Sequence, residues 1–139
     1  MRSLAAIELI SIGLLLAACD GSQEPAAVTY PDVRAAMEGS DAAAFEPYRG
    51  TLVRWTGQVA EARRQFGDDY AEEGVLLVEM DAGTAEQNPG PDVIFLIPPS
   101  KVPEMAPGQP VTFVGIIREP QRGERGEKLL RMELKELEE

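Results

Sequence analysis

Two charged segments of the sequence contain the side chains best suited to bind a ligand. In the first segment, residues 62–74, two arginines lie close to two aromatic residues, a combination that stacks on nucleobases or sugars. The second segment, residues 118–128, is rich in arginine, and six basic residues lie in the two segments together. The candidate binding residues are Arg63, Arg64, Phe66 and Tyr70 in the first segment and Arg118, Arg122 and Arg125 in the second.

Acidic side chains in the same segments support a second interpretation. The seven acids that accompany the six bases are Asp68, Asp69, Glu72, Glu73, Glu119, Glu124 and Glu127. Such mixtures are usually solvated loops with weak ion pairs. The spacing of the first four acids matches no ordered calcium loop, so no metal site is expected. The two segments are therefore either a ligand site or ordinary surface.

The composition argues against catalysis. The 139 residues contain no histidine and one cysteine, which removes the commonest general base and metal ligand and the usual partner of a nucleophile. No phosphate-binding loop and no nucleophile–base pair is recognisable, so we expect neither an enzyme nor a bound cofactor. The net charge of −11 repels nucleic-acid phosphates and suits a basic partner or simple solubility.

The N-terminus has the pattern of an export signal. Arg2 precedes an uncharged, mostly apolar run from Leu9 to Ala18, which is too short to span a bilayer as a stable helix. The run ends in Leu16-Ala17-Ala18-Cys19, which resembles the lipobox of bacterial lipoproteins. That resemblance implies a signal peptide over residues 1–18 and a lipid on Cys19. The alternative is a plain signal peptide cut after an Ala-x-Ala-like site, with a cysteine there by chance.

The lipobox resemblance also implies an address. A diacylglycerol on the Cys19 thiol, with fatty acyl chains such as palmitate, would hold the domain on the bacterial cell membrane, facing the periplasm. Asp20 follows Cys19 and resembles the signal that retains lipoproteins in the inner membrane in enterobacteria-like sorting. Removal of residues 1–18 takes away one base and one acid, so the remaining 121 residues keep a net charge of −11 and suffice for one domain.

After a polar tether over residues 19–30, the domain over residues 31–139 begins with helical spacing. Pro31-Asp32 predicts a helix start, and Val33, Ala36, Met37 and Ser40 share one face, extended by Ala43 and Ala44. Gly39-Ser40 interrupts the run, which indicates two short helices, and Pro47 and Gly50 end it.

The rest of the domain has the patterns of strands. Alternation from Thr51 to Val59 and apolar runs at residues 75–80, 93–97 and 111–117 predict four strands, of which the third is covered on both faces. The proline-rich stretch 98–110 holds at most one helical turn, at residues 102–105. The tail, residues 128–137, fits strand or helix, and we favour a strand to about Leu134 because a fifth strand closes an open edge. Trp55, Phe95 and Phe113 are expected in the core, although Trp55 could instead be a binding platform.

A helix followed by five short strands, with glycines inside the first and fourth, predicts a mainly β, small closed barrel. Two motifs resemble the small bacterial OB-fold proteins called tRNA-anti-like: Tyr48-Arg49-Gly50 followed by residues 53–59 (VRWTGQV), and residues 105–115 (MAPGQPVTFVG). Met105 and Gln109 replace the family's more usual leucine and aspartate. The resemblance spans about residues 32–135 and implies an OB-like barrel, but no particular activity.

These observations together predict a membrane-anchored extracytoplasmic lipoprotein whose OB-like domain is a non-enzymatic module that binds another protein of the cell envelope. OB-folds bind on the face of strands two and three, between the loops that follow strands one and four, and the two charged segments occupy those positions. The alternatives are a small-ligand or glycan receptor that uses Arg63, Arg64, Phe66 and Tyr70, and an inhibitor of a basic enzyme such as lysozyme.

Overall fold

The computed structural model describes residues 24–39, 41–80 and 91–138. The predicted signal peptide, the lipidation site at Cys19, Asp20 and Ser40 lie outside the described residues. None of the helices within the described ranges is both long and apolar enough to cross a membrane.

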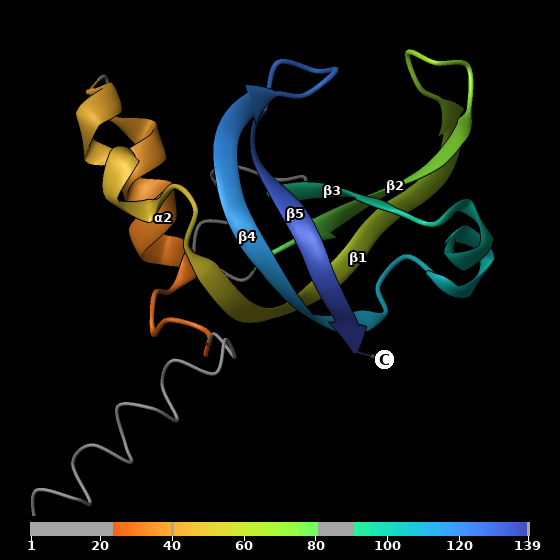
Figure 1. The fold of residues 1–139 in the computed structure, drawn as a ribbon, viewed down its shortest axis with the longest axis horizontal. Coiled ribbons are helices and arrows are strands. Elements are labelled where there is room, and N and C mark those ends of the chain that lie inside the picture. Colours follow the sequence, from red (N-terminus) through yellow and green to blue (C-terminus); the bar gives the residue numbers. More distant parts are fainter. Residues whose placement is uncertain (1–23, 40, 81–90, 139) are drawn as a thin grey trace, which may run out of the picture.

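Five antiparallel and parallel strands close into a barrel, as the sequence predicts. They are β1 (Leu52–Phe66), β2 (Glu72–Glu79), β3 (Val93–Ile97), β4 (Pro110–Arg122) and β5 (Lys128–Glu138). Their order around the barrel is β1-β2-β3-β5-β4, and only the β3–β5 pair is parallel. The chain therefore folds as a mainly β, OB-like barrel preceded by a short helix (Figure 1). The tail is a strand, and it extends beyond Leu134.

Two long hairpins replace the two predicted charged loops, which is a correction to the sequence analysis. β1 continues to Phe66 and β2 starts at Glu72, so only a short turn remains of the predicted loop 62–74. β4 likewise continues to Arg122, and β5 starts at Lys128. Solvated strand arms have polar side chains on both faces, so they lack the apolar alternation that reveals a strand. In place of apolar contacts, ion pairs between the two strands stabilise the pairing of β1 with β2, such as Arg64–Glu72 with 3.4 Å between nitrogen and oxygen.

The barrel interior is filled by the expected aromatic side chains. Trp55 is 7% exposed, and its ring meets those of Tyr30 and Phe113 edge-on at centroid distances of 5.7 and 6.4 Å. Phe95 packs against Phe113 at 5.1 Å. The indole N–H of Trp55 donates to the carbonyl of Val28 at 2.8 Å, so part of the predicted tether is bound to the barrel. Trp55 is a core residue and not a binding platform.

The prediction that the third strand is covered on both faces is wrong. The bounds of β3 agree with the sequence, but the side chain of Leu96 is 54% exposed. β2 is the strand that is covered on both faces, because Leu76 and Val78 enter the main core while Val75 and Leu77 pack in a second apolar cluster. Apolar runs of similar composition therefore occupy different environments.

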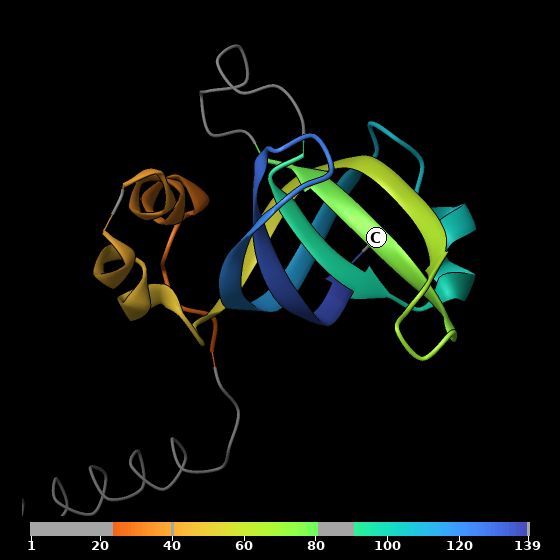
Figure 2. The same cartoon turned by 90° about the horizontal axis from the view of Figure 1, so that it is seen from above.

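Helical segments lie on opposite sides of the barrel (Figure 2). On one side, α2 (Tyr30–Glu38) ends before Gly39 and is followed by the 3₁₀ turns η1 (Ala42–Ala44) and η2 (Glu46–Tyr48), which confirms the predicted interruption. On the other side, η3 (Pro99–Glu104) is longer than the single turn expected, because its 3₁₀ geometry accommodates both Pro99 and Pro103.

A buried polar network joins α2 to the point where the barrel closes. Asp92, 7% exposed, lies just before β3, and its Oδ2 accepts a hydrogen bond from the Met80 backbone N–H at 2.7 Å. Its Oδ1 lies 3.7 Å from Nη1 of Arg34, which also donates to the Tyr30 hydroxyl at 3.3 Å. Burial raises the pKa of Asp92, against the opposing effects of the Met80 N–H and Arg34. Burial, followed by the charge of Asp92, raises the pKa of Tyr30 to about 12.

The raised pKa of Tyr30 predicts an alkaline transition. Because the fold favours the neutral phenol, the stability that this group contributes is complete below pH 10 and is lost as the pH rises through about 12. In absorbance titrations of tyrosinate, the wild-type protein should show a step near pH 12 that Tyr30→Phe lacks. The free energy of unfolding should fall less between pH 10 and 12 in that variant. A wild-type step for Tyr30 at pH 10 would contradict the buried network.

Candidate functional site

A cleft of about 1040 Å³ lies between the two long hairpins. Both hairpins rise on the same side of the barrel and stand apart at their tips (Figure 1). Residues from all five strands line the cleft, including the arms of both hairpins and the outer face of β2 and β3. This is the face on which the sequence analysis placed a binding site.

The floor of the cleft is apolar. It consists of the second apolar cluster, namely Ala60, Val75, Leu77, Ile94 and Leu129, all of which line the cleft. Leu129 comes from the β4–β5 hairpin and packs on Val75 and Leu77 of β2, so this contact fixes the curl of that hairpin over the sheet. We call this set the apolar floor.

The walls of the cleft carry nearly balanced charge in a strongly acidic chain. The lining holds five arginines and four glutamates. They are Arg63, Arg118, Arg122, Arg125, Arg131, Glu61, Glu124, Glu127 and Glu133. The acidity that would repel an anionic or acidic ligand from the rest of the molecule is therefore neutralised locally.

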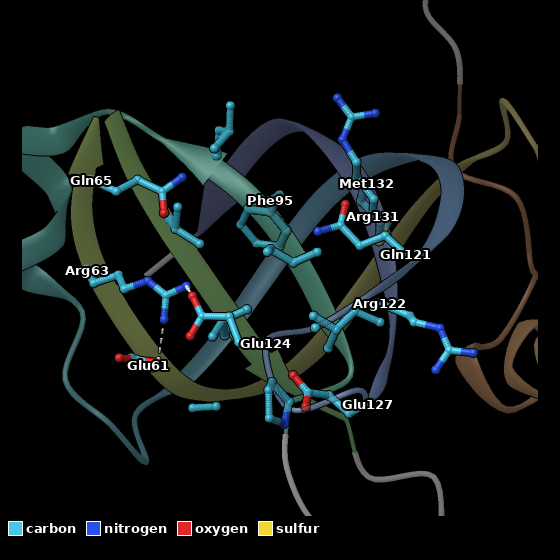
Figure 3. Close-up of a pocket in the computed structure, with 18 of the residues that line it drawn as sticks. Glu61, Arg63, Gln65, Phe95, Gln121, Arg122, Glu124, Glu127, Arg131 and Met132 are labelled. Carbon is cyan, nitrogen blue, oxygen red and sulfur yellow. Dashed lines mark hydrogen bonds and ion pairs between the residues drawn. The ribbon is translucent and has the colours of Figure 1, made fainter. Parts of the chain in front are cut away.

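One ion pair bridges the two hairpins across the cleft. Nη2 of Arg63, from β1, lies 2.8 Å from Oε1 of Glu124, in the β4–β5 turn, and Nη1 of the same side chain lies 3.2 Å from Glu61 (Figure 3). Arg63 is about two-thirds buried, whereas Glu124 is largely exposed. Because Glu124 is largely exposed to solvent, we expect this ion pair to contribute no more than about 1 kcal/mol, so a ligand can replace it at low cost.

The remaining arginines of the cleft differ in their contacts. Arg118 is hydrogen-bonded to Glu133, whose pKa is lowered by Arg118 first and by Lys135 second. In contrast, neither Arg122 nor Arg125 makes a side-chain ion pair within the described part of the chain. Arg122 points away from the middle of the cleft, whereas the amide of Gln121 points towards Phe95 (Figure 3).

The structure separates the seven candidate binding residues into two groups. Those that line the cleft are Arg63, Arg118, Arg122 and Arg125. Arg64 belongs to the other face of β1, where its Nε donates to the Pro99 carbonyl at 3.3 Å, because successive strand residues point to opposite faces. Phe66 and Tyr70 lie outside the cleft, at the end of the β1–β2 hairpin, with 73% and 87% of their surface exposed. The combined arginine–aromatic site is therefore not assembled.

Sequence reasoning missed the apolar floor, Leu96, Gln65, Gln121 and Arg131. A signal for the floor was present in residues 75–78 (VLLV), where both alternating faces are apolar, so the outward side chains Val75 and Leu77 require a cover. The contribution of Leu129 had no such signal, because only the curl of the β4–β5 hairpin brings it there.

In the part of the chain that the structure describes, no cluster of three or more carboxylate, histidine or cysteine side chains could hold a metal ion. The side chains that line the cleft offer apolar contact, ion pairing and hydrogen bonding to a ligand.

No protein-family model and no curated protein matches this chain. Among solved structures, the chain is similar to a candidate nucleic acid-binding lipoprotein from Klebsiella pneumoniae subsp. pneumoniae MGH 78578. The TM-score is 0.47 and the sequence identity 20%, over 68% of this chain and 78% of the other. The described chain is an OB-like barrel with an N-terminal helix, and membership of the tRNA-anti-like family stays a prediction.

Tyr70 has a strained backbone that predicts a stabilising substitution. Its φ of 62° lies in the left-handed region, which side chains other than glycine, asparagine and aspartate rarely adopt, and no buried contact holds it there. Tyr70→Gly should raise the free energy of unfolding by about 1 kcal/mol in urea denaturation, because it removes this strain. Tyr70→Ala is the matched control, since it removes the ring but keeps the Cβ. An equal gain in both variants would show that the ring, and not the backbone, is unfavourable.

Proposed function

We propose that this protein is an extracytoplasmic lipoprotein whose barrel binds another protein of the cell envelope in the cleft between the two hairpins, without catalysis. The observation that carries the proposal is the apolar floor enclosed by charged walls. Protein interfaces have this composition, with an apolar centre, arginines and a polar rim. The complete absence of histidine and the lack of a metal cluster in the described ranges support binding without catalysis.

The partner is a protein and not a nucleic acid, because a net charge of −11 opposes the approach of phosphates. The cleft is nearly neutral, so it accepts a surface with both apolar and charged side chains. The projecting hairpins increase the surface that a partner contacts on both sides of the floor.

Photocrosslinking in living cells tests the binding site. With p-benzoylphenylalanine in place of Gln121, which lines the cleft, irradiation should join the protein to a discrete partner. The matched control replaces Ala35, an exposed residue of α2 outside the cleft. Absence of an adduct at Gln121, or the same adduct at both positions, would contradict the proposed site.

A small ligand or glycan is the second candidate, because the volume of about 1040 Å³ is close to that of known ligand pockets. The two candidates differ in a thermal-shift screen with purified cell-wall fragments. A small ligand that binds in the cleft raises the melting temperature of the purified domain, and Val75→Lys should remove that effect by placing a charge in the apolar floor.

The proposed anchor is the lipid on Cys19, and the following Asp20 favours the inner membrane. We expect Cys19→Ala to accumulate as an unprocessed precursor that lacks the acyl chains, because the thiol that accepts the lipid is gone. Gel mobility and mass spectrometry of membrane fractions measure both effects, and Ser22→Ala serves as the control. Normal processing of Cys19→Ala would refute the lipid anchor.

A further inference from the structure

β3 is paired with β5 along only part of its length. Among the described residues, the two strands pair at Val93↔Leu130 and Ile94↔Arg131, whereas β2 pairs with all five residues of β3. Beyond these residues, β5 continues to Glu138 and pairs along this stretch with β4. The seam between β3 and β5 is therefore closed at one end and open from Phe95 onwards.

The direction of the backbone groups follows from this register. Leu130 N–H donates to the Asp92 carbonyl at 2.8 Å, and the parallel pairing then places both the N–H and the C=O of Ile94 on the β5 side. Because backbone groups alternate along a strand, those of Leu96 point the same way, past the last paired residue. Leu96 thus presents one donor and one acceptor to the open seam.

The cleft gives access to this edge. Phe95 and Leu96 line it from β3, and Met132, Glu133 and Leu134 line it from β5. The side chain of Leu96 is 54% exposed beside the apolar floor. Proteins normally protect an accessible strand edge with a charge, a proline, a bulge or a paired strand, and position 96 has none of these on its β5 side among residues 24–39, 41–80 and 91–138.

We propose that the partner inserts an extended peptide segment at this seam, as an added strand that hydrogen-bonds to the backbone of Leu96. This proposal rests on the proposed function and specifies how the partner is recognised. Unpaired backbone groups of a strand are satisfied best by another extended backbone, which is the recognition mode called β-augmentation.

The surroundings define the sequence of such a segment. On the side of the seam that faces the core, side chains of the segment would lie against Phe95 and Met132, which are 2% and 3% exposed, so small apolar residues fit best at these positions. Side chains on the other face would lie beside Leu96 and between the charged walls, where both apolar and charged residues fit. In the expected segment, apolar residues alternate with residues that are either apolar or charged.

Hydrogen exchange of the unliganded protein tests the open edge. We expect the amide of Leu96 to exchange at least about tenfold faster than those of Ile94 and Phe95, which are bonded to β5 and β2 respectively. NMR resolves these three amides individually. If Leu96 is as protected as Ile94, the edge is already satisfied and the proposal is overturned.

Binding of a defined peptide tests the added strand. The probe is an octapeptide with acetylated and amidated ends, in which every second residue is valine and the others are lysine and glutamate in turn. Its net charge is zero, so the acidity of the protein does not drive association. We expect it to slow exchange of the Leu96 amide, whereas its N-methylated counterpart, which keeps the side chains but lacks the amide donors, should not. Equal binding of both peptides, or binding of neither, overturns the proposal.

Variants of Leu96 separate the backbone from the side chain. Leu96→Pro removes the N–H that faces the seam and leaves the pairing with β2 intact, so it should lower the affinity for the octapeptide about tenfold. Leu96→Ala keeps the N–H and should lower this affinity less. Circular dichroism verifies that both variants fold. Equal losses would mean that only the side chain is recognised, which overturns the added strand. If the octapeptide binds but the crosslinker at position 121 yields no partner, the proposed function is contradicted while the added strand is not.

Discussion

Closure of the barrel depends on the buried carboxylate of Asp92. A β3 strand of five residues can form only a short parallel contact with β5, and Asp92 reinforces that contact from three directions. Its backbone C=O accepts from Leu130 of β5, its side chain accepts from Met80 after β2, and Arg34 of α2 balances its charge. A buried carboxylate without these partners would cost several kcal/mol, so helix, sheet and closure are interdependent. The N-terminal helix is thus part of the barrel's stability and not an appendage.

The same closure explains where the cleft lies. Because Asp92 holds β3 and β5 together at one end only, the strands separate beyond Ile94 and expose an edge beside the apolar floor. The two hairpins then rise on both sides of this opening. Their charged residues pair across the strands and across the cleft, as Arg63 and Glu124 do, and so keep long polar arms ordered without a hydrophobic core. Stability is concentrated in the barrel, and recognition surface is added at its rim.

Much of the fold could be predicted from the sequence, because buried strands leave a period of two. The sequence correctly predicts that Trp55 and Phe113 lie in the core, and the predicted bounds of β3 agree with the structure. The arms of the hairpins could not be found in this way, since polar residues on both faces of a strand look like a loop. Four of the seven predicted binding residues line the cleft, because charge makes arginines conspicuous in a sequence, whereas Leu129 and Leu96 are ordinary apolar residues whose role depends on position.

The sequence by itself determined the barrel, the leading helix, the absence of histidine chemistry and the acidic charge. These properties depend on composition and local periodicity, which a linear chain displays directly. Only the tertiary structure decided that Arg63 and Arg64 face opposite ways, that the floor under the hairpins is apolar, and that the seam beside Leu96 stays open. Those properties depend on the curl of each hairpin and on the place where two distant strands stop pairing, and neither is encoded in a local pattern.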